Sequence, residues 1–167
     1  MTHYFDVLEK EEYQQLKDAI ALITVYIAGA DGEIDQDEAQ WATKVTKIRS
    51  YNLPNELGSF YQDVGPEFSD KLSAFQNELN TLEVRNQKVA KRLAALNPIL
   101  AKLDPMMGAA LYNSYISFAK HVAKASGGFL GFFAIGPEEA ALLELKMINP
   151  IEYEEELASH EEDTDED

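Results

Sequence analysis

The stretch AGADGEIDQDEAQW, residues 28–41, holds the side chains of this sequence that are best suited to chemistry. Five of its residues are acidic and lie within eight positions. The chain has no cysteine and only three histidines, so a bound metal would be held mainly by oxygen, which favours calcium or magnesium. Asp31, Asp35 and Glu38 are therefore candidate ligands for a divalent cation.

An EF-hand calcium loop is the nearest known pattern, and this stretch matches only half of it. With Asp31 at the fifth loop position, the sixth, eighth, ninth and twelfth positions hold residues that the EF-hand pattern accepts, which are Gly32, Ile34, Asp35 and Glu38. The first and third positions then fall on Ile27 and Gly29, which have no side-chain oxygen. An EF-hand is excluded, and a metal site here needs oxygen ligands from another part of the chain.

Helix capping explains the same acids without a metal. In residues 35–38, DQDE, the Asp35 side chain can accept hydrogen bonds from first-turn amides while Glu38 reaches back to the amide of the cap. Residues 136–139, GPEE, combine a glycine cap, a first-turn proline and acids near the positive end of the helix dipole. Capping and metal binding both remain open as interpretations of these residues.

Apolar residues recur at three- and four-residue spacing along the body of the chain, and no segment shows sustained strand alternation. The sequence therefore predicts an all-α fold, a helical bundle. The first helix carries an apolar stripe made of Leu16, Ile20, Ile23, Ile27 and Ala30.

The acids of the opening stretch lie where a second helix should begin. We expect this helix to begin after Asp35 and to end near residues 52–54, where asparagine and proline interrupt the pattern. Trp41, Val45 and Ile48 are predicted to face the interior.

Later helix boundaries follow from prolines and caps. Residues 66–103 keep a helical pattern, with a break expected near residues 80–81 and a kink or end at Pro98. Another long helix is predicted after residues 104–105, an aspartate cap followed by a first-turn proline. A short helix should occupy residues 137–149.

Two segments of the chain have matching apolar patterns, which indicates an internal duplication. AIALITVYIAGADG, residues 19–32, aligns with SYISFAKHVAKASG, residues 114–127, and the apolar stripe keeps its phase. After an insertion in the second copy, EIDQDEA at residues 33–39 aligns with AIGPEEA at residues 134–140. We therefore expect two pseudo-symmetric helix–turn–helix halves.

Packing of these halves about a pseudo-twofold axis would bring the two acidic helix starts together. Asp31, Asp35 and Glu38 would then share space with Glu138 and Glu139. Carboxylates that lie close together repel one another unless a cation or protons neutralise them. These five residues are the predicted ligands of a calcium or magnesium ion.

The same residues resemble a known family, the TerB-like domain of tellurite-resistance proteins, which is also found fused to DnaJ-type cochaperones. The resemblance rests on Ala-Asp-Gly at residues 30–32 followed by I-x-x-x-E at residues 34–38. The stretch ASGGFLGFFAIGPEEA, residues 125–140, is similar to the second half-site of the family. The resemblance covers roughly residues 16–48 and 107–148.

Membership in this family would imply an all-helical bundle with pseudo-twofold halves. It would also imply an acidic surface proposed to bind divalent metal and a role in tellurite or stress response. One position departs from the pattern, because Ser126 stands where the first copy has Asp31. This departure weakens the second half as a ligand set.

The charge of the chain is strongly acidic and unevenly placed. There are 30 acidic and 14 basic residues, and ten of the acids follow residue 151 without any Lys or Arg among them. Because such a segment repels itself, we expect a helical domain over residues 1–150 and a disordered acidic tail over residues 151–167. Nucleic-acid binding is not expected, since phosphate recognition requires clustered Lys and Arg.

Two segments are candidate sites for a protein partner. One is the acidic tail, and the other is the apolar loop GGFLGFF, which runs from Gly127 to Phe133 and could instead fold back over the end of the bundle. No basic residues flank the loop, so membrane contact is not expected.

The sequence shows no signal peptide and no apolar run long enough to span a bilayer, which favours a cytoplasmic protein. His121 aligns with Tyr26 in the repeat and is predicted to be a half-buried packing residue.

Patterns typical of enzymes do not occur in this sequence. We find no nucleophile–histidine–acid arrangement, no glycine-rich phosphate loop and no HExxH. We therefore expect a non-enzymatic TerB-like module that binds a divalent metal or a protein partner. The alternative is a hydrolase that uses a metal ion held by carboxylates.

Overall fold

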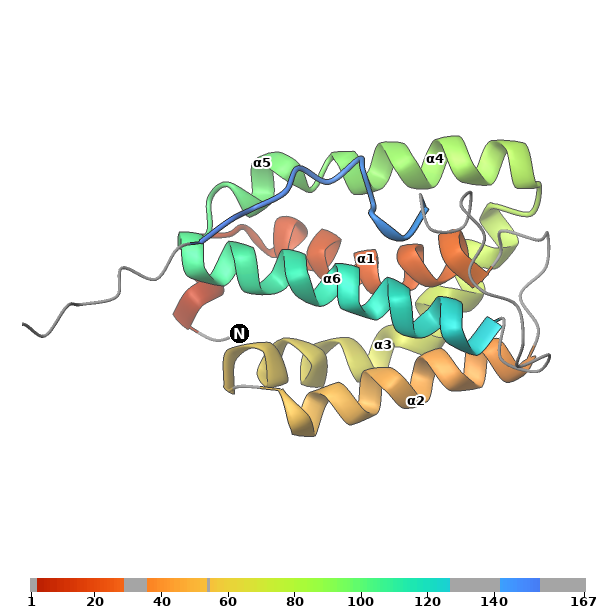
Figure 1. Ribbon diagram of the computed structural model, residues 1–167, viewed down its shortest axis with the longest axis horizontal. Coiled ribbons are helices and arrows are strands. Elements are labelled where there is room, and N and C mark those ends of the chain that lie inside the picture. The colour runs from red at the N-terminus through yellow and green to blue at the C-terminus, as the bar shows by residue number, and fades with distance from the viewer. Residues whose placement is uncertain (1–2, 29–35, 54, 127–141, 154–167) are drawn as a thin grey trace, which may run out of the picture.

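The computed structural model describes residues 3–28, 36–53, 55–126 and 142–153. Within these ranges the protein is an all-α bundle with no strand, as the sequence predicts (Figure 1). The elements, in chain order, are η1 (His3–Phe5), α1 (Lys10–Ala28), α2 (Gln36–Asn52), α3 (Asn55–Glu78), α4 (Leu82–Ala94), α5 (Asn97–Leu100) and α6 (Pro105–Ser126).

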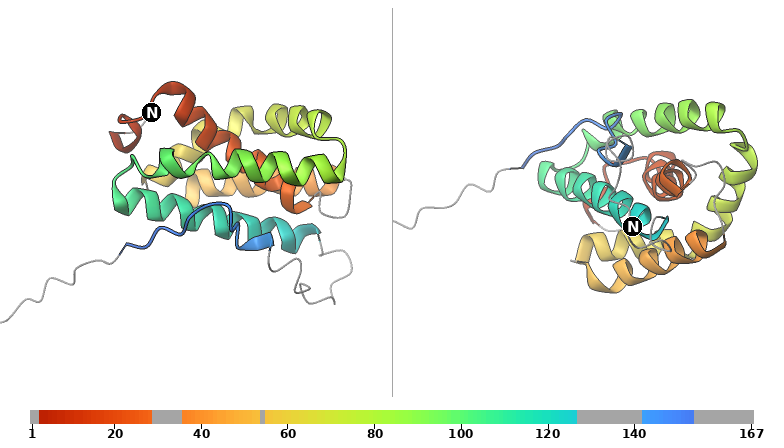
Figure 2. Two further views of the ribbon diagram at one scale, coloured as in Figure 1. Left: turned by 90° about the horizontal axis from the view of Figure 1, so that it is seen from above. Right: turned by 45° about the vertical axis from the view of Figure 1, so that its right-hand side comes forward.

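Helix α1 runs through the middle of the bundle and packs against α3, α4 and α6 (Figure 2). Its predicted apolar stripe is buried: Leu16, Ile20 and Ile23 are fully enclosed, and Ile27 is nearly so. Burial of each such side chain stabilises the fold by about 1.5–3 kcal/mol. The last residue of the predicted stripe, Ala30, lies outside the described residues.

Helix α6 carries the second predicted stripe. Leu111, Tyr115, Phe118 and Val122 are all buried. The hydroxyl of Tyr115 donates to the carbonyl oxygen of Leu16 at 2.8 Å, which joins α6 to α1. The two stripes therefore have the predicted burial. The duplication itself stays a prediction, because the segments that follow the two helices lie outside the described residues.

The helical pattern predicted from Pro66 onward is present, but α3 begins earlier, at Asn55, and continues through the proline. Proline removes the hydrogen bond to the carbonyl of Gln62, but this residue is exposed, so water can replace the missing donor. Buried residues before the proline, including Phe60 and Val64, hold this part of the helix on the core.

The boundaries predicted between α3 and α4, at Pro98 and at the start of α6 are confirmed. Residues 79–81 separate α3 from α4, and Pro98 lies in the first turn of α5, after the end of α4. At the start of α6, Oδ1 of Asp104 accepts a hydrogen bond from the amide of Met106 at 3.0 Å. This bond is the expected cap and fixes where α6 begins.

The end of the described chain, residues 142–153, is held by Asn97 of α5. The side-chain amide of Asn97 donates to the carbonyl oxygen of Met147 at 3.0 Å, and its Oδ1 accepts from the amide of Asn149 at 2.8 Å. Ile151 then packs against the core of the bundle. The chain is therefore tied to α5 shortly before the acidic tail begins.

The short helix predicted for residues 137–149 is described only from residue 142. Residues 142–143 are helical, and turns follow them up to Met147. Leu145 in these turns is fully buried at a φ of 44°, a left-handed conformation that costs a leucine about 1–3 kcal/mol. Burial of this side chain helps to hold the strained turn. Among the described residues, no helix has the length and apolarity that crossing a membrane requires.

Candidate functional site

The predicted metal site is not tested by this structure. Asp31, Asp35, Glu138 and Glu139 lie outside the described residues, and of Glu38, in the first turn of α2, only the backbone is described. Within the described ranges, no three His, Asp or Glu side chains converge so that they could hold a metal ion. The five ligands and their calcium or magnesium ion stay predictions. The GGFLGFF loop and residues 154–167 of the acidic tail also lie outside the described residues, so their predicted roles stay predictions.

Helix α2 buries a different face from the predicted one. Trp41 and Ile48 are expected to face inward, and both expectations are wrong, since these residues are 37% and 43% exposed. The residues that α2 buries are Ala42, Val45, Thr46 and Arg49. Because two of these are small, α2 can lie close to α3 and α6, and the larger apolar side chains remain at the edge of the contact.

Trp41, Lys44, Ile48 and Tyr51 form one exposed stripe along α2. Their spacing of three, four and three residues keeps them on one side of the helix. Nζ of Lys44 lies 5.5 Å from the centroid of the Trp41 ring, a cation–π contact. Nε1 of Trp41 donates to the carbonyl oxygen of His121 at 3.4 Å. This bond places the stripe on the side of α2 that borders α6.

Helix α6 continues this surface with Lys120, His121 and Lys124, which are all exposed. Lys124 follows His121 by three positions and so lies on the same side of the helix. The prediction that His121 is half-buried is wrong, because this residue is exposed. We call the stripe on α2 together with these three residues the α2–α6 face.

The helices of the α2–α6 face are basic although the chain as a whole is acidic. After its first turn, α2 contains Lys44, Lys47 and Arg49 and no Asp or Glu. Helix α6 contains Lys120 and Lys124 and no acidic residue at all. In a chain with a net charge of −16, this is a local reversal of sign.

Arg49 lies beneath this face and is only 8% exposed. Its Nη1 donates to Oγ of Ser114 at 3.0 Å, to the carbonyl oxygen of the same residue at 3.2 Å and to the Tyr61 hydroxyl at 3.4 Å. Its Nη2 donates to Oγ of Ser117 at 3.0 Å. The guanidinium carbon lies 5.5 Å from the ring centroids of Tyr61 and Phe118. Arg49 thus joins α2 to α3 and α6.

None of the described carboxylates pairs with Arg49. Burial raises the pKa of Tyr61, although the charge of Arg49 and the Ser114 hydroxyl act to lower it, so the phenol stays neutral. A buried cation without an anion is costly, and hydroxyls and aromatic rings offset only part of that cost. Sequence reasoning missed Arg49; the available signal was its helical spacing from Ala42 and Val45 on the buried side of α2.

The edge of the Arg49 guanidinium made of Nε and Nη2 has one acceptor among the described residues, the Ser117 hydroxyl. Nδ1 of His121 lies 3.5 Å from Nη2 of Arg49 but only 2.7 Å from the carbonyl oxygen of Ser117. Because a carbonyl oxygen only accepts, Nδ1 must carry a hydrogen and cannot also accept one from Arg49. No described residue accepts from Nε of Arg49. The Nε–Nη2 edge is one of those that bind a carboxylate through two hydrogen bonds.

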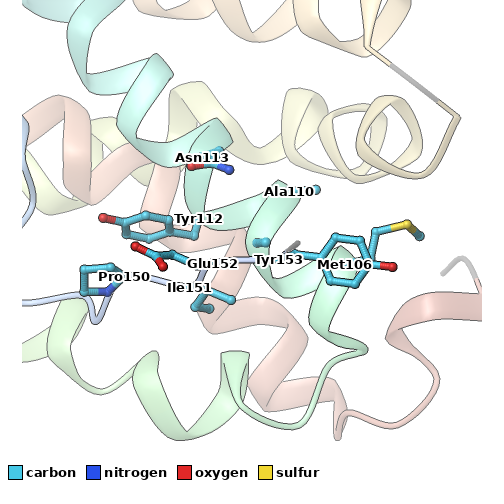
Figure 3. Close-up of a pocket in the computed structure, with 9 residues that line it drawn as sticks. Met106, Ala110, Tyr112, Asn113, Pro150, Ile151, Glu152 and Tyr153 are labelled. Atoms are coloured by element: carbon cyan, nitrogen blue, oxygen red, sulfur yellow. The ribbon is translucent and has the colours of Figure 1, made fainter. Parts of the chain in front are cut away.

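A groove of about 530 Å³ lies elsewhere, between the first half of α6 and the end of the described chain (Figure 3). Tyr112 and Asn113 line it from α6, and Ile151, Glu152 and Tyr153 line it from the opposite side. Its one charged side chain is that of Glu152, which has the same sign as the whole chain. The lining of the groove therefore contains no cationic side chain that could pair with an acidic ligand.

No family model, no curated protein and no solved structure matches this chain. The resemblance to TerB-like domains therefore rests on the residue patterns alone, and membership in that family stays a prediction.

Proposed function

We propose that this protein is a non-enzymatic interaction module that binds an acidic polypeptide segment on the α2–α6 face. The observation that carries the proposal is the exposed stripe of Trp41, Ile48 and Tyr51 on helices that are basic within an acidic chain. Aromatic side chains of this kind often carry most of the binding energy at protein interfaces. The flanking lysines supply charge complementarity for acidic residues of the partner.

The dimensions of the stripe suit a short helix. Trp41 and Tyr51 are ten residues apart on α2, which corresponds to about 15 Å along the helix axis. An amphipathic partner helix of two to three turns could lay its apolar side on this stripe and its acids against the lysines of α6. Nucleic acid is a poorer fit, because the overall charge of −16 repels a phosphate backbone before contact.

The metal-binding role belongs to a different part of the molecule. Calcium or magnesium binding by Asp31, Asp35, Glu38, Glu138 and Glu139 stays a prediction, as does the link to tellurite or stress response that the TerB resemblance implies. The alternative function, a metal-dependent hydrolase, requires the same ligands and depends on the same test.

Binding can be followed through Trp41, because it is the only tryptophan in the chain. We expect an amphipathic peptide of about 18 residues, with leucines on one face and glutamates on the other, to change the Trp41 fluorescence. The dissociation constant should lie in the range of about 1–100 µM and should rise with added salt. The same peptide with lysine in place of glutamate should not bind.

A matched pair of variants tests the position of the site. Ile48 in α2 and Val84 in α4 are both 43% exposed. Ile48→Ser should weaken binding about tenfold, because it removes apolar area from the stripe. Val84→Ser should leave binding unchanged. Equal affinities of the two variants, or no fluorescence change with the acidic peptide, would contradict the proposed function.

A further inference from the structure

We propose that Arg49 binds a carboxylate of the partner through its Nε–Nη2 edge, with Ser117 and His121 forming the entrance. This inference rests on the proposed function and adds to it a specific anion site beneath the α2–α6 face. The ligand class is a glutamate or aspartate side chain of the bound acidic segment.

The charge of Arg49 is incompletely neutralised by the described residues. Its partners among the described residues are neutral oxygens and two aromatic rings, and the side chain is more than nine-tenths buried. An ion pair in such a place is strong when both hydrogen bonds form, since the guanidinium fork matches the carboxylate in geometry. A carboxylate from outside would supply the charge that the described chain does not.

The two sides of the Arg49 guanidinium face surroundings that differ in burial. Nη1 is turned inward, where it bonds to Ser114 and Tyr61, both of which are buried. Nη2 is turned toward Ser117, which is half-buried, and toward His121, which is exposed. The Nε–Nη2 edge, whose one described acceptor is Ser117 Oγ, is therefore the edge that lies beside the exposed His121 of the α2–α6 face.

The entrance to this edge can open without disturbing the core. The His121 ring is tied to the protein through one hydrogen bond, from Nδ1 to the carbonyl oxygen of Ser117. Rotation of this exposed side chain breaks that single bond and uncovers Nη2 of Arg49. The Ser117 hydroxyl, which now accepts from Arg49, can turn its own hydrogen toward the incoming carboxylate.

The site can be observed directly by NMR, because the chain has only three arginines, Arg49, Arg85 and Arg92. Addition of the acidic peptide should move the Nε–H resonance of Arg49 downfield and slow its exchange with water, as expected for a bond to a carboxylate. The resonances of Arg85 and Arg92 serve as internal controls and should not move.

Affinity provides the second readout. Arg49→Lys keeps the charge but removes the fork, so we expect binding of the acidic peptide to weaken about tenfold. A peptide with glutamine in place of glutamate should bind wild type and Arg49→Lys equally weakly.

The outcomes separate the two proposals. If the peptide changes the Trp41 fluorescence while the Arg49 Nε–H resonance stays in place and Arg49→Lys binds as tightly as wild type, the anion site is wrong and the proposed function survives. If wild type does not bind the acidic peptide at all, both proposals fail. The NMR readout uses the wild-type protein, so it holds even if Arg49→Lys folds poorly.

Discussion

The cations at the α1–α3 contact have partners of a different kind from those of the cation at the α2–α6 contact. Between α1 and α3, Nζ of Lys17 lies 3.1 Å from a carboxylate oxygen of Glu67, and Nζ of Lys71 lies 3.0 Å from one of Asp18. Between α2 and α6, the cation is Arg49, and its described partners are neutral. The better buried cation is thus the one without a carboxylate.

This difference cannot be explained by a shortage of acids, because the chain has 30 acidic residues against 14 basic ones. Each ion pair between α1 and α3 has one member that is more than a third exposed, Glu67 in one and Lys71 in the other, so solvent screens both pairs and each gains little. Arg49 would gain more from a carboxylate partner. It lies between α2 and α6, and α6 contains no acidic residue while α2 contains none after its first turn. The comparison indicates that an anion for Arg49 comes from outside these helices, as the proposed site requires.

A metal ion would be a third means of neutralising charge, and it should have the largest effect on stability. If Asp31, Asp35 and Glu38 help to bind calcium or magnesium, addition of the metal at about 100 times its dissociation constant should stabilise the fold by about 2.7 kcal/mol. Asp31→Asn and Glu38→Gln should each reduce this gain. The measurement is thermal melting with chelator and then with millimolar metal.

Capping predicts a different result for the same variants. Glutamine can replace glutamate in a capping box and asparagine suits a turn, so both variants should melt close to wild type. Wild-type protein that melts at one temperature with chelator and with metal would show that the metal hypothesis is wrong. The metal-dependent hydrolase would be excluded by the same result.

The paired contact between α1 and α3 should show a small sensitivity to acid. Hydrogen bonds from Gln14 and Lys17 lower the pKa of Glu67 below its ordinary value. A carboxylate whose pKa is lowered by folding contributes stability at neutral pH, and this contribution is lost as the pH falls through the folded-state pKa. Because the side chain of Glu67 is 45% exposed, we expect only a few tenths of a kcal/mol.

Glu67→Gln tests this expectation in denaturant titrations at neutral and at acidic pH. The variant should be slightly less stable than wild type at neutral pH, and the difference should disappear when Glu67 is protonated. A difference that persists at acidic pH would mean that packing, and not charge, accounts for the contribution of Glu67.

The helical fold could be predicted from the sequence because long apolar stripes encode it. Residues such as Ile20 and Tyr115 recur at helical spacing, and both are buried as expected. Boundaries marked by a cap or a break, such as Asp104, were also predictable. The start of α3 before Pro66 was not predictable, because the sequence does not reveal that Gln62, whose carbonyl receives no hydrogen bond from the proline, is exposed.

The candidate site was not predictable in the same way. On α2 the buried positions include Ala42, Thr46 and Arg49, which have little or no hydrophobic signal, while the exposed positions include Trp41 and Ile48. The orientation of this helix is set by how closely it approaches α3 and α6, and that distance is a property of the packed bundle. The spacing of Arg49 from Val45 could have indicated its burial, but the hydroxyls that surround it are visible only in the structure.

Arg49 has no carboxylate partner among the described residues, and in the proposed site the binding partner supplies it. The substitution Ser117→Asp would place a carboxylate of the chain itself at this position. The Ser117 hydroxyl lies 3.0 Å from Nη2 of Arg49, so an aspartate at this position would reach the guanidinium. Ser117→Asn is the matched control, because asparagine has the same shape and a similar helix propensity but no charge.

The measurement is the melting temperature of both variants, together with their affinity for the acidic peptide. We predict that Ser117→Asp is more stable than Ser117→Asn by about 1–2 kcal/mol, since it completes a buried ion pair. It should also bind the peptide about tenfold more weakly, because its own carboxylate occupies the site. If Ser117→Asp is no more stable than Ser117→Asn and binds the peptide equally well, Arg49 needs no anion and the account is wrong.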